Sequence, residues 1–140
     1  MPCNCTVNPT PTPQVDDWTP DLVEIEARHK QSADYLLFVI DAQTRAIASI
    51  VEATEYCVVG REVILCIVDV PPGTEIDGAV VGEREMKDLN RARQYLRDVA
   101  HRHGILVHDE VPHALHDLRM RLQVFEHICM DPAAEELVAT

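Results

Sequence analysis

The chain has 140 residues, of which 46% are hydrophobic, and this is enough to bury the core of one globular domain. Twelve Lys and Arg residues stand against 24 Asp and Glu residues, and the resulting formal charge of -12 argues against nucleic acid as a partner, because phosphate backbones would be repelled. No apolar run approaches the roughly 20 residues that cross a bilayer, and the N-terminus lacks the pattern of a signal peptide. We therefore expect a cytoplasmic protein that makes no membrane contact.

The five cysteines do not have the pattern of a disulfide framework. Cys3 and Cys5 fall in a polar N-terminal segment, Cys57 and Cys66 fall inside apolar segments, and Cys129 lies near the C-terminus. An odd number at irregular spacing is typical of reduced thiols in an intracellular protein.

Residues 1–19 form a Pro-rich leader without a periodic pattern, and we expect them to be extended. Thr19 and Pro20 are a typical helix start, with Thr as the cap and Pro in the first turn. The following residues to about Ser32 carry an incomplete apolar stripe at helical spacing, so a short amphipathic helix is predicted there.

Strands and helices then alternate along the chain. Short apolar runs such as "YLLFVI" and "EVILCIV" are typical of strands buried in parallel sheets. Gly60 and Gly104 are helix stop signals. The pattern predicts strands over 35–40, 62–68 and 105–109, helices over 46–59, 83–103 and 111–124, and therefore an α/β domain with a short, right-handedly connected parallel sheet.

The segment from Asp69 to Gly82, "DVPPGTEIDGAVVG", is predicted to be a loop. It is long for a connection in a compact domain, and loops of this length often carry function.

One carboxylate, Glu52, falls in the helix that follows the first strand, within "TRAIASIVEA". Ligands of open parallel sheets bind beyond the carboxyl ends of the strands, where such helices begin. Small neighbours would let a ligand approach, and the positive end of the helix dipole would favour the ionised form that a nucleophile needs. The alternative is a solvated Glu with a purely structural role, and the residue pattern alone favours it.

The stretches "PQVDDWTPDLVEIEARHKQSADYLLFVID", "TRAIASIVEA", "GREVILCIVDV" and "DLNRARQYL" resemble the nucleoside 2-deoxyribosyltransferase-like family, which includes deoxyribonucleoside 5'-monophosphate N-glycosidases. The core of the resemblance, which covers about residues 14–115, is Asp34 at the start of a strand and Glu52 18 residues later. It implies a Rossmann-like (flavodoxin-like) three-layer sandwich over residues 20–126, followed by a tail over 127–140. The family begins with a further strand that residues 1–20 do not match, so the chain looks as if it lacks this strand.

The resemblance also implies a chemistry. Glu52 would attack the anomeric carbon of a 2'-deoxynucleoside or its 5'-monophosphate, and Glu26 would give a proton to the departing base, with no cofactor. Hydrolase and transferase outcomes both stay open, and family members usually form dimers or higher homo-oligomers. The alternative is a catalytically weak or inactive paralogue that acts as a nucleotide-binding or dimerisation module.

Three further residues are candidates for substrate binding: Asp41, Arg45 and Ser49. In the family, a side chain six residues before the nucleophile binds the sugar hydroxyl or a 5'-phosphate, and here that position is Ala46. Arg45 and Ser49 could bind phosphate instead, whereas a surface pair between Arg45 and Asp41 is the alternative. Asp41 itself could contact the ligand or cap the next turn.

The other charged residues carry weaker signals. The seven histidines give no compact set with metal-ligand spacing, and no metal site is predicted. Exposed salt bridges are expected on the helix over 83–103, and by family analogy two of its residues would lie near subunit contacts. The expected exposed face is Asp88, Arg91, Arg93, Arg97 and Asp98, and the two contact candidates are Asn90 and Tyr95.

Overall fold

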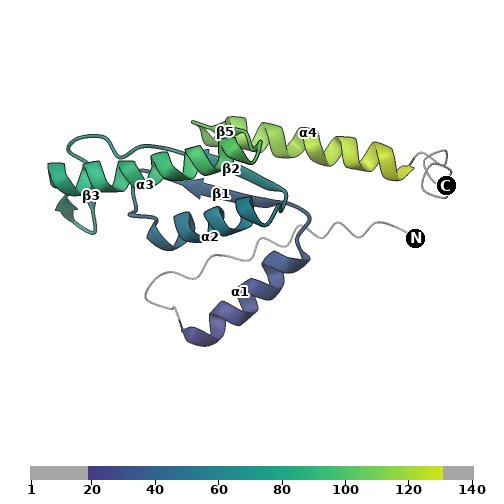
Figure 1. Ribbon diagram of the computed structural model, residues 1–140, viewed down its shortest axis with the longest axis horizontal. Helices are drawn as coiled ribbons and strands as arrows, with labels where there is room; N and C mark the ends of the chain where they lie inside the picture. The colour runs from purple at the N-terminus through teal and green to yellow at the C-terminus, as the bar shows by residue number, and fades with distance from the viewer. Residues whose placement is uncertain (1–18, 131–140) are drawn as a thin grey trace. The chain divides into compact units, whose positions relative to one another are not determined.

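The computed structural model describes residues 19–130, and side chains over residues 19–124 (Figure 1). The predicted leader therefore lies almost entirely outside the described residues, as does most of the predicted tail. The chain divides into two compact units, Met1–Ala33 and Asp34–Thr140, which are described separately below.

The first unit contributes one described helix, α1 (Pro20–Ser32), which confirms the helix predicted there. Pro20 occupies its first turn, where the missing N–H has no helical acceptor to lose. Thr19 occupies the N-cap position in an extended conformation, but its side chain makes no capping hydrogen bond. No residue of α1 is buried.

The second unit is an α/β domain with a short parallel sheet, as predicted, and is consistent with a Rossmann-like fold (Figure 1). The sheet has the strand order β1-β2-β5. The elements in chain order are β1 (Leu36–Ile40), α2 (Ile47–Val58), β2 (Val63–Ile67), β3 (Glu75–Ile76), β4 (Ala79–Val80), α3 (Glu83–Arg102), β5 (Val107–His108) and α4 (Val111–Met130).

The central strand β2 is the core of the domain, because all five of its residues are buried. Alternate residues of a strand point to opposite faces. Ile64 and Cys66 meet Ala114 of α4 on one face, and α2 and α3 pack against each other and the other face. The sheet is thus covered on both sides, which explains why its strands are continuously apolar.

The two strand pairings of β2 differ in length. Strand β1 pairs with β2 along its whole length, from Leu36 opposite Val63 to Ile40 opposite Ile67. Strand β5 pairs with β2 at only two positions. The carboxyl end of β2 therefore extends beyond its partner on that side, and its carbonyls there must find other donors.

The segment predicted as a loop over 69–82 contains a β-hairpin, so that prediction was wrong in part. Strands β3 and β4 pair in antiparallel orientation, with Asp77 and Gly78 between them at φ values of 54° and 77°. Two consecutive positive φ angles are what a type I′ turn requires, and Asp-Gly is a preferred sequence for it. Ile76 is buried with Val81 in a small cluster that also includes Leu89 of α3.

Helix α4 continues to Met130, beyond the end predicted near Val124. Within residues 19–130, no helix combines the length and apolar composition needed to cross a membrane. Of the cysteines whose side chains are described, Cys57 and Cys66 are free and buried, and burial raises the pKa of both thiols.

Candidate functional site

The carboxyl end of β1 leads into a tight turn that Asp41 organises. Its Oδ1 accepts hydrogen bonds from the backbone N–H of Gln43 at 2.9 Å, from that of Thr44 at 3.0 Å and from the Thr44 hydroxyl at 3.1 Å. Of the two predicted roles of Asp41, ligand contact and capping of the next turn, the structure therefore shows the capping. Ligand binding by the other carboxylate oxygen stays a prediction.

Helix α2 begins from an unusual backbone conformation at Ala46, its N-cap. Ala46 has φ 55° and ψ 29°, which is the left-handed region, and its side chain makes no capping hydrogen bond. A non-glycine residue there costs roughly 1–2 kcal/mol, and such strain often occurs at ligand sites.

Glu52 is the sixth residue of α2 and is half-buried, next to the fully buried Ala53. The first turn of α2 contains no acidic residue, so Glu52 lies beyond the turn in which the helix dipole acts most strongly. Ser49 and Tyr56 are also half-buried, one turn on either side of Glu52. The Tyr56 ring lies 6.1 Å from that of Phe38 on β1, so this face of α2 turns toward the strand.

Arg45 does not pair with Asp41, and this alternative was wrong. Its Nη1 donates to Asp77 in the hairpin turn at 2.6 Å, and its Nε donates to Glu85 in the first turns of α3 at 2.8 Å. Glu85 and then Asp77 raise the pKa of Arg45. One cation thus joins the turn before α2 to two carboxylates from other elements.

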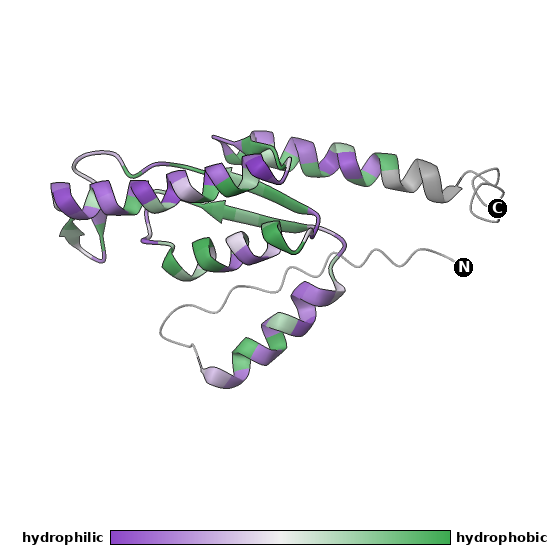
Figure 2. Cartoon of the chain, in the orientation of Figure 1, coloured by the Kyte–Doolittle hydropathy of each residue, from purple (hydrophilic) through white to green (hydrophobic). Residues whose placement is uncertain are grey.

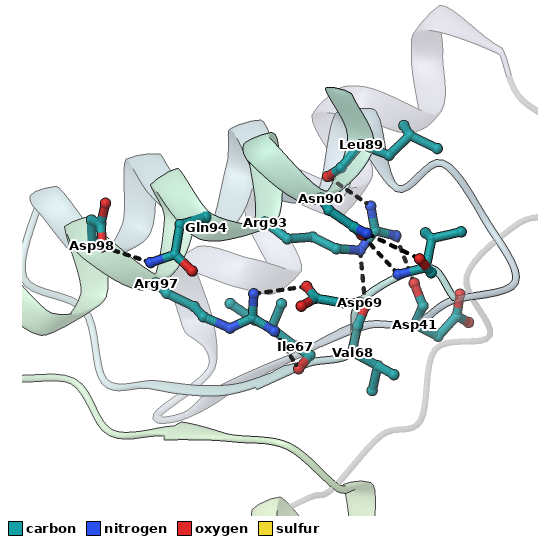
Figure 3. Close-up of polar contacts among 11 residues, drawn as sticks. Asp41, Ile67, Val68, Asp69, Leu89, Asn90, Arg93, Gln94, Arg97 and Asp98 are labelled. Atoms are coloured by element: carbon teal, nitrogen blue, oxygen red, sulfur yellow. Dashed lines mark hydrogen bonds and ion pairs between the residues drawn. The ribbon is translucent and has the colours of Figure 1, made fainter. Parts of the chain in front are cut away.

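The prediction of an exposed, salt-bridged face on α3 was wrong for Arg93, which is 0% exposed. Its guanidinium donates to the backbone carbonyls of Val68 at 2.9 Å, Leu89 at 3.1 Å and Asp41 at 2.7 Å (Figure 3). It also donates to a fourth carbonyl, that of Thr44, at 3.0 Å. Burial lowers the pKa of Arg93. The side chain fixes the Asp41 turn to the end of β2.

Two neighbours on α3 complete this contact (Figure 3). Asn90 binds both backbone groups of Val70, accepting from its N–H at 2.8 Å and donating to its carbonyl at 3.0 Å. Arg97 donates to the carbonyl of Ile67 at 3.1 Å and to Asp69 at 2.8 Å. These three side chains supply donors to the carboxyl end of β2, where β5 no longer pairs.

The prediction of an exposed ion pair holds for Arg91 and Asp88, but not for Arg97, whose side chain is 22% exposed and pairs with Asp69 outside the helix. Arg91 pairs with Asp88 at 3.1 Å, and both side chains are exposed. Asp98 is exposed and accepts a hydrogen bond from Gln94 at 2.9 Å. Tyr95 is 66% exposed, and its place in a subunit contact stays a prediction.

One feature of the sequence indicates that Arg93 is buried. The apolar stripe of α3 runs through Met86, Leu89 and Leu96, and the helical period places position 93 between the last two. A charged residue within an apolar stripe is expected to be buried with its donors satisfied.

Glu26, the predicted acid, lies on α1 in the first compact unit, whereas the other four candidates lie in the second. It is half-buried, and its carboxylate lies 3.7 Å from the ammonium of Lys30. That Glu26 and Glu52 serve one site stays a prediction.

A second polar cluster joins β5, α4 and the start of β2. The Asp117 carboxylate lies 3.0 Å from Nε2 of His108 and accepts two hydrogen bonds from Arg121 at 2.9 and 3.1 Å. Arg121 also contacts Glu62 at 3.4 Å. The Asp117 side chain is 19% exposed, so these contacts are partly shielded from water.

Replacing Asp117 with Asn should lower the free energy of unfolding by about 1–2 kcal/mol at neutral pH, because charge-assisted hydrogen bonds are lost. The hydrogen bond from Arg121 is the main cause that holds the pKa of Asp117 below its ordinary value of 3.8. The carboxylate therefore stabilises the fold above about pH 4, and this stabilisation is lost as the pH falls through the folded-state pKa. Urea unfolding of wild type and variant at neutral pH and at about pH 3 measures it.

The difference between the two proteins should shrink at the lower pH. The exposed Asp88→Asn change is the control, since it should alter stability by less than about 0.5 kcal/mol. If Asp117→Asn lowers the free energy of unfolding equally at both pH values, the Asp117 carboxylate is not the group that stabilises the fold.

No group of three or more potential metal ligands lies together among the residues that the structure describes. His101, His103, His113 and His116 are exposed.

The comparisons with known proteins give one result. The sequence model of the family described as "Nucleoside 2-deoxyribosyltransferase like" matches residues 9–70. The resemblance inferred from the sequence is confirmed over this part, which contains all five candidate site residues, and stays a prediction over residues 71–115. No curated protein and no solved structure gives a significant match.

Proposed function

We propose that this chain cleaves the N-glycosidic bond of 2'-deoxynucleosides or their 5'-monophosphates. The basis is the similarity of residues 9–70 to the nucleoside 2-deoxyribosyltransferase-like family. Glu52 is the nucleophile and Glu26 the acid, while Asp41, Arg45 and Ser49 bind the substrate. The single observation that carries the proposal is the family match, because it includes Glu52 and the four other residues.

The proposed reaction has two steps. A carboxylate oxygen of Glu52 bonds to C1′ as the N-glycosidic bond breaks, and the base keeps the electron pair and takes the proton of Glu26. Water or a second base then attacks C1′, the Glu26 carboxylate takes the proton of the attacking group, and Glu52 is released as the carboxylate. This is the logic of a retaining glycosidase, in which a nearby carboxylate stabilises an oxocarbenium-like transition state.

A half-buried Glu52 supports this proposal. A nucleophile must be open to the sugar and yet partly shielded from water, and Glu52 has this intermediate exposure. The left-handed Ala46 and the Asp41 turn lie just before it in the chain, where the helix after a parallel strand begins.

The test is to trap the covalent intermediate. Wild type is mixed with the four 2'-deoxynucleosides and their 5'-monophosphates, quenched in acid, and digested for mass spectrometry, while chromatography detects free base. We expect free base, and a deoxyribosyl group on the peptide that contains Glu52. An adduct on a different residue would show that the nucleophile is wrongly assigned, and the absence of free base would refute the enzymatic proposal.

One observation favours the second candidate, an inactive dimerisation module. Helix α2 is largely hydrophobic (Figure 2), and Ile47, Val51 and Val58 on it are 65%, 64% and 55% exposed. Exposed apolar side chains that are grouped on one helix often mark a contact with another chain. The module is favoured if wild type releases no base but sediments as a homodimer that Val51→Asp dissociates.

A further inference from the structure

We propose that Asp77 and Glu85 are specificity-determining residues: by neutralising Arg45, they make the protein prefer 2'-deoxynucleosides with a free 5'-hydroxyl over their 5'-monophosphates. This inference rests on the function proposed above. It goes beyond it by choosing between the two substrate classes and by naming residues that the sequence did not suggest.

The charge at Arg45 carries the argument. The guanidinium meets two carboxylates, Asp77 at 2.6 Å and Glu85 at 2.8 Å, so the trio has one positive and two negative charges. The two carboxylates occupy Nε and one N–H of Nη1, which are among the donors through which arginine binds phosphate. A phosphate that binds the remaining N–H groups of Arg45 would lie beside both carboxylates, and like charges at that distance repel.

Arg93 and Arg97, which also lie at this edge of the sheet, offer no replacement. Arg93 is 0% exposed, and its guanidinium is bound to backbone carbonyls. Arg97 is paired with Asp69 at 2.8 Å. A neutral 5'-hydroxyl needs no cation and meets none of this repulsion. Repulsion built against one ligand is a common source of specificity for another.

The two carboxylates can be neutralised without disturbing the fold. Asp77 adopts a positive φ of 54° in the hairpin turn, a conformation that Asn accepts as readily as Asp. The side chains of Asp77 and Glu85 are 82% and 42% exposed, and ion pairs at such exposure contribute little to stability. The double variant Asp77→Asn/Glu85→Gln should therefore fold like wild type.

The test measures the Kd of a deoxynucleoside and of its 5'-monophosphate by calorimetry, for each of the four bases. The full chain carries Glu52→Gln throughout, so that the ligands persist. We expect the deoxynucleoside to bind at least about tenfold more tightly than the monophosphate. Asp77→Asn/Glu85→Gln should shift this ratio at least about tenfold toward the monophosphate, which is the size of one charge-assisted hydrogen bond.

Two further variants test the cause. Glu75→Gln/Glu83→Gln removes the same charge from the β3–β4 hairpin and the first turn of α3, and should leave the ratio unchanged. Adding Arg45→Ala to Asp77→Asn/Glu85→Gln should abolish the shift.

Three results would overturn the inference: a wild-type ratio that favours the monophosphate, equal shifts in both double variants, or no binding of either ligand. Its failure can be told from failure of the proposed function. Base release without discrimination at the 5' position leaves the function standing and removes the inference. If the protein binds the deoxynucleoside more tightly than the monophosphate but releases no base, the proposed function is removed and the preference at the 5' position stands.

Discussion

Replacing Glu52 with Gln should reduce the rate of base release at least about 1,000-fold. The amide of Gln cannot form the covalent glycosyl-enzyme, so the proposed two-step route is lost. Gln has nearly the same size, so the half-buried site on α2 should keep its packing. The measurement is the initial rate of base release by chromatography, with 2'-deoxynucleosides and 5'-monophosphates as substrates.

The matched control is Glu55→Gln on the same helix. Glu55 is exposed, whereas Glu52 is half-buried, and both changes remove one negative charge from α2. The control should keep its rate within about twofold, since surface substitutions away from the site have small effects. If the two variants lose activity equally, the charge of the helix matters rather than a nucleophile at position 52.

Replacing Arg93 with Ala should lower the free energy of unfolding by about 3–5 kcal/mol, the range seen when one partner of a buried charged network is removed. Three carbonyls outside the helix, those of Asp41, Thr44 and Val68, would lose the donor that satisfies them. Urea unfolding followed by circular dichroism measures the loss. The control is Arg91→Ala on the same helix, where both partners of the ion pair are exposed and the expected loss is below about 1 kcal/mol.

Arg93→Lys separates charge from geometry. An ammonium keeps the charge but cannot donate to acceptors in so many directions, so we expect a loss between those of wild type and alanine. If Arg93→Ala is no less stable than Arg91→Ala, the four backbone contacts contribute nothing, and the role assigned to Arg93 is wrong.

The order and type of the main elements could be predicted from the sequence because each has a strong local pattern. "EVILCIV" forms the fully buried central strand β2, and "YLLFVI" forms the partly buried edge strand β1. Both runs are continuously apolar, and Gly60 and Gly104 are the stop signals of the helices that follow them. The β3–β4 hairpin was missed because its strands have only two residues each, too few for alternation to be visible. The Asp77-Gly78 pair was the available signal.

The candidate site was predicted less completely than the fold. A resemblance can place Glu52 on a helix after a strand, but the partners of Arg45 come from positions 77 and 85, 32 and 40 residues away in the chain. Long-range ion pairs leave no periodic trace in a sequence. A charged side chain on a helix is usually exposed, so charge alone predicts a surface position for Arg93, although it lies in the apolar stripe of α3 and is buried.

The Arg93 contacts also affect how a ligand would bind at the turn after β1. The turn from Asp41 to Thr44 is held by the guanidinium of a helix that is distant in the chain, and it is closed internally by the Asp41 carboxylate. Such a turn has little conformational freedom left to lose. Whatever molecule docks against it meets a preorganised surface, and the entropic penalty of ordering that loop was met when the chain folded rather than at association.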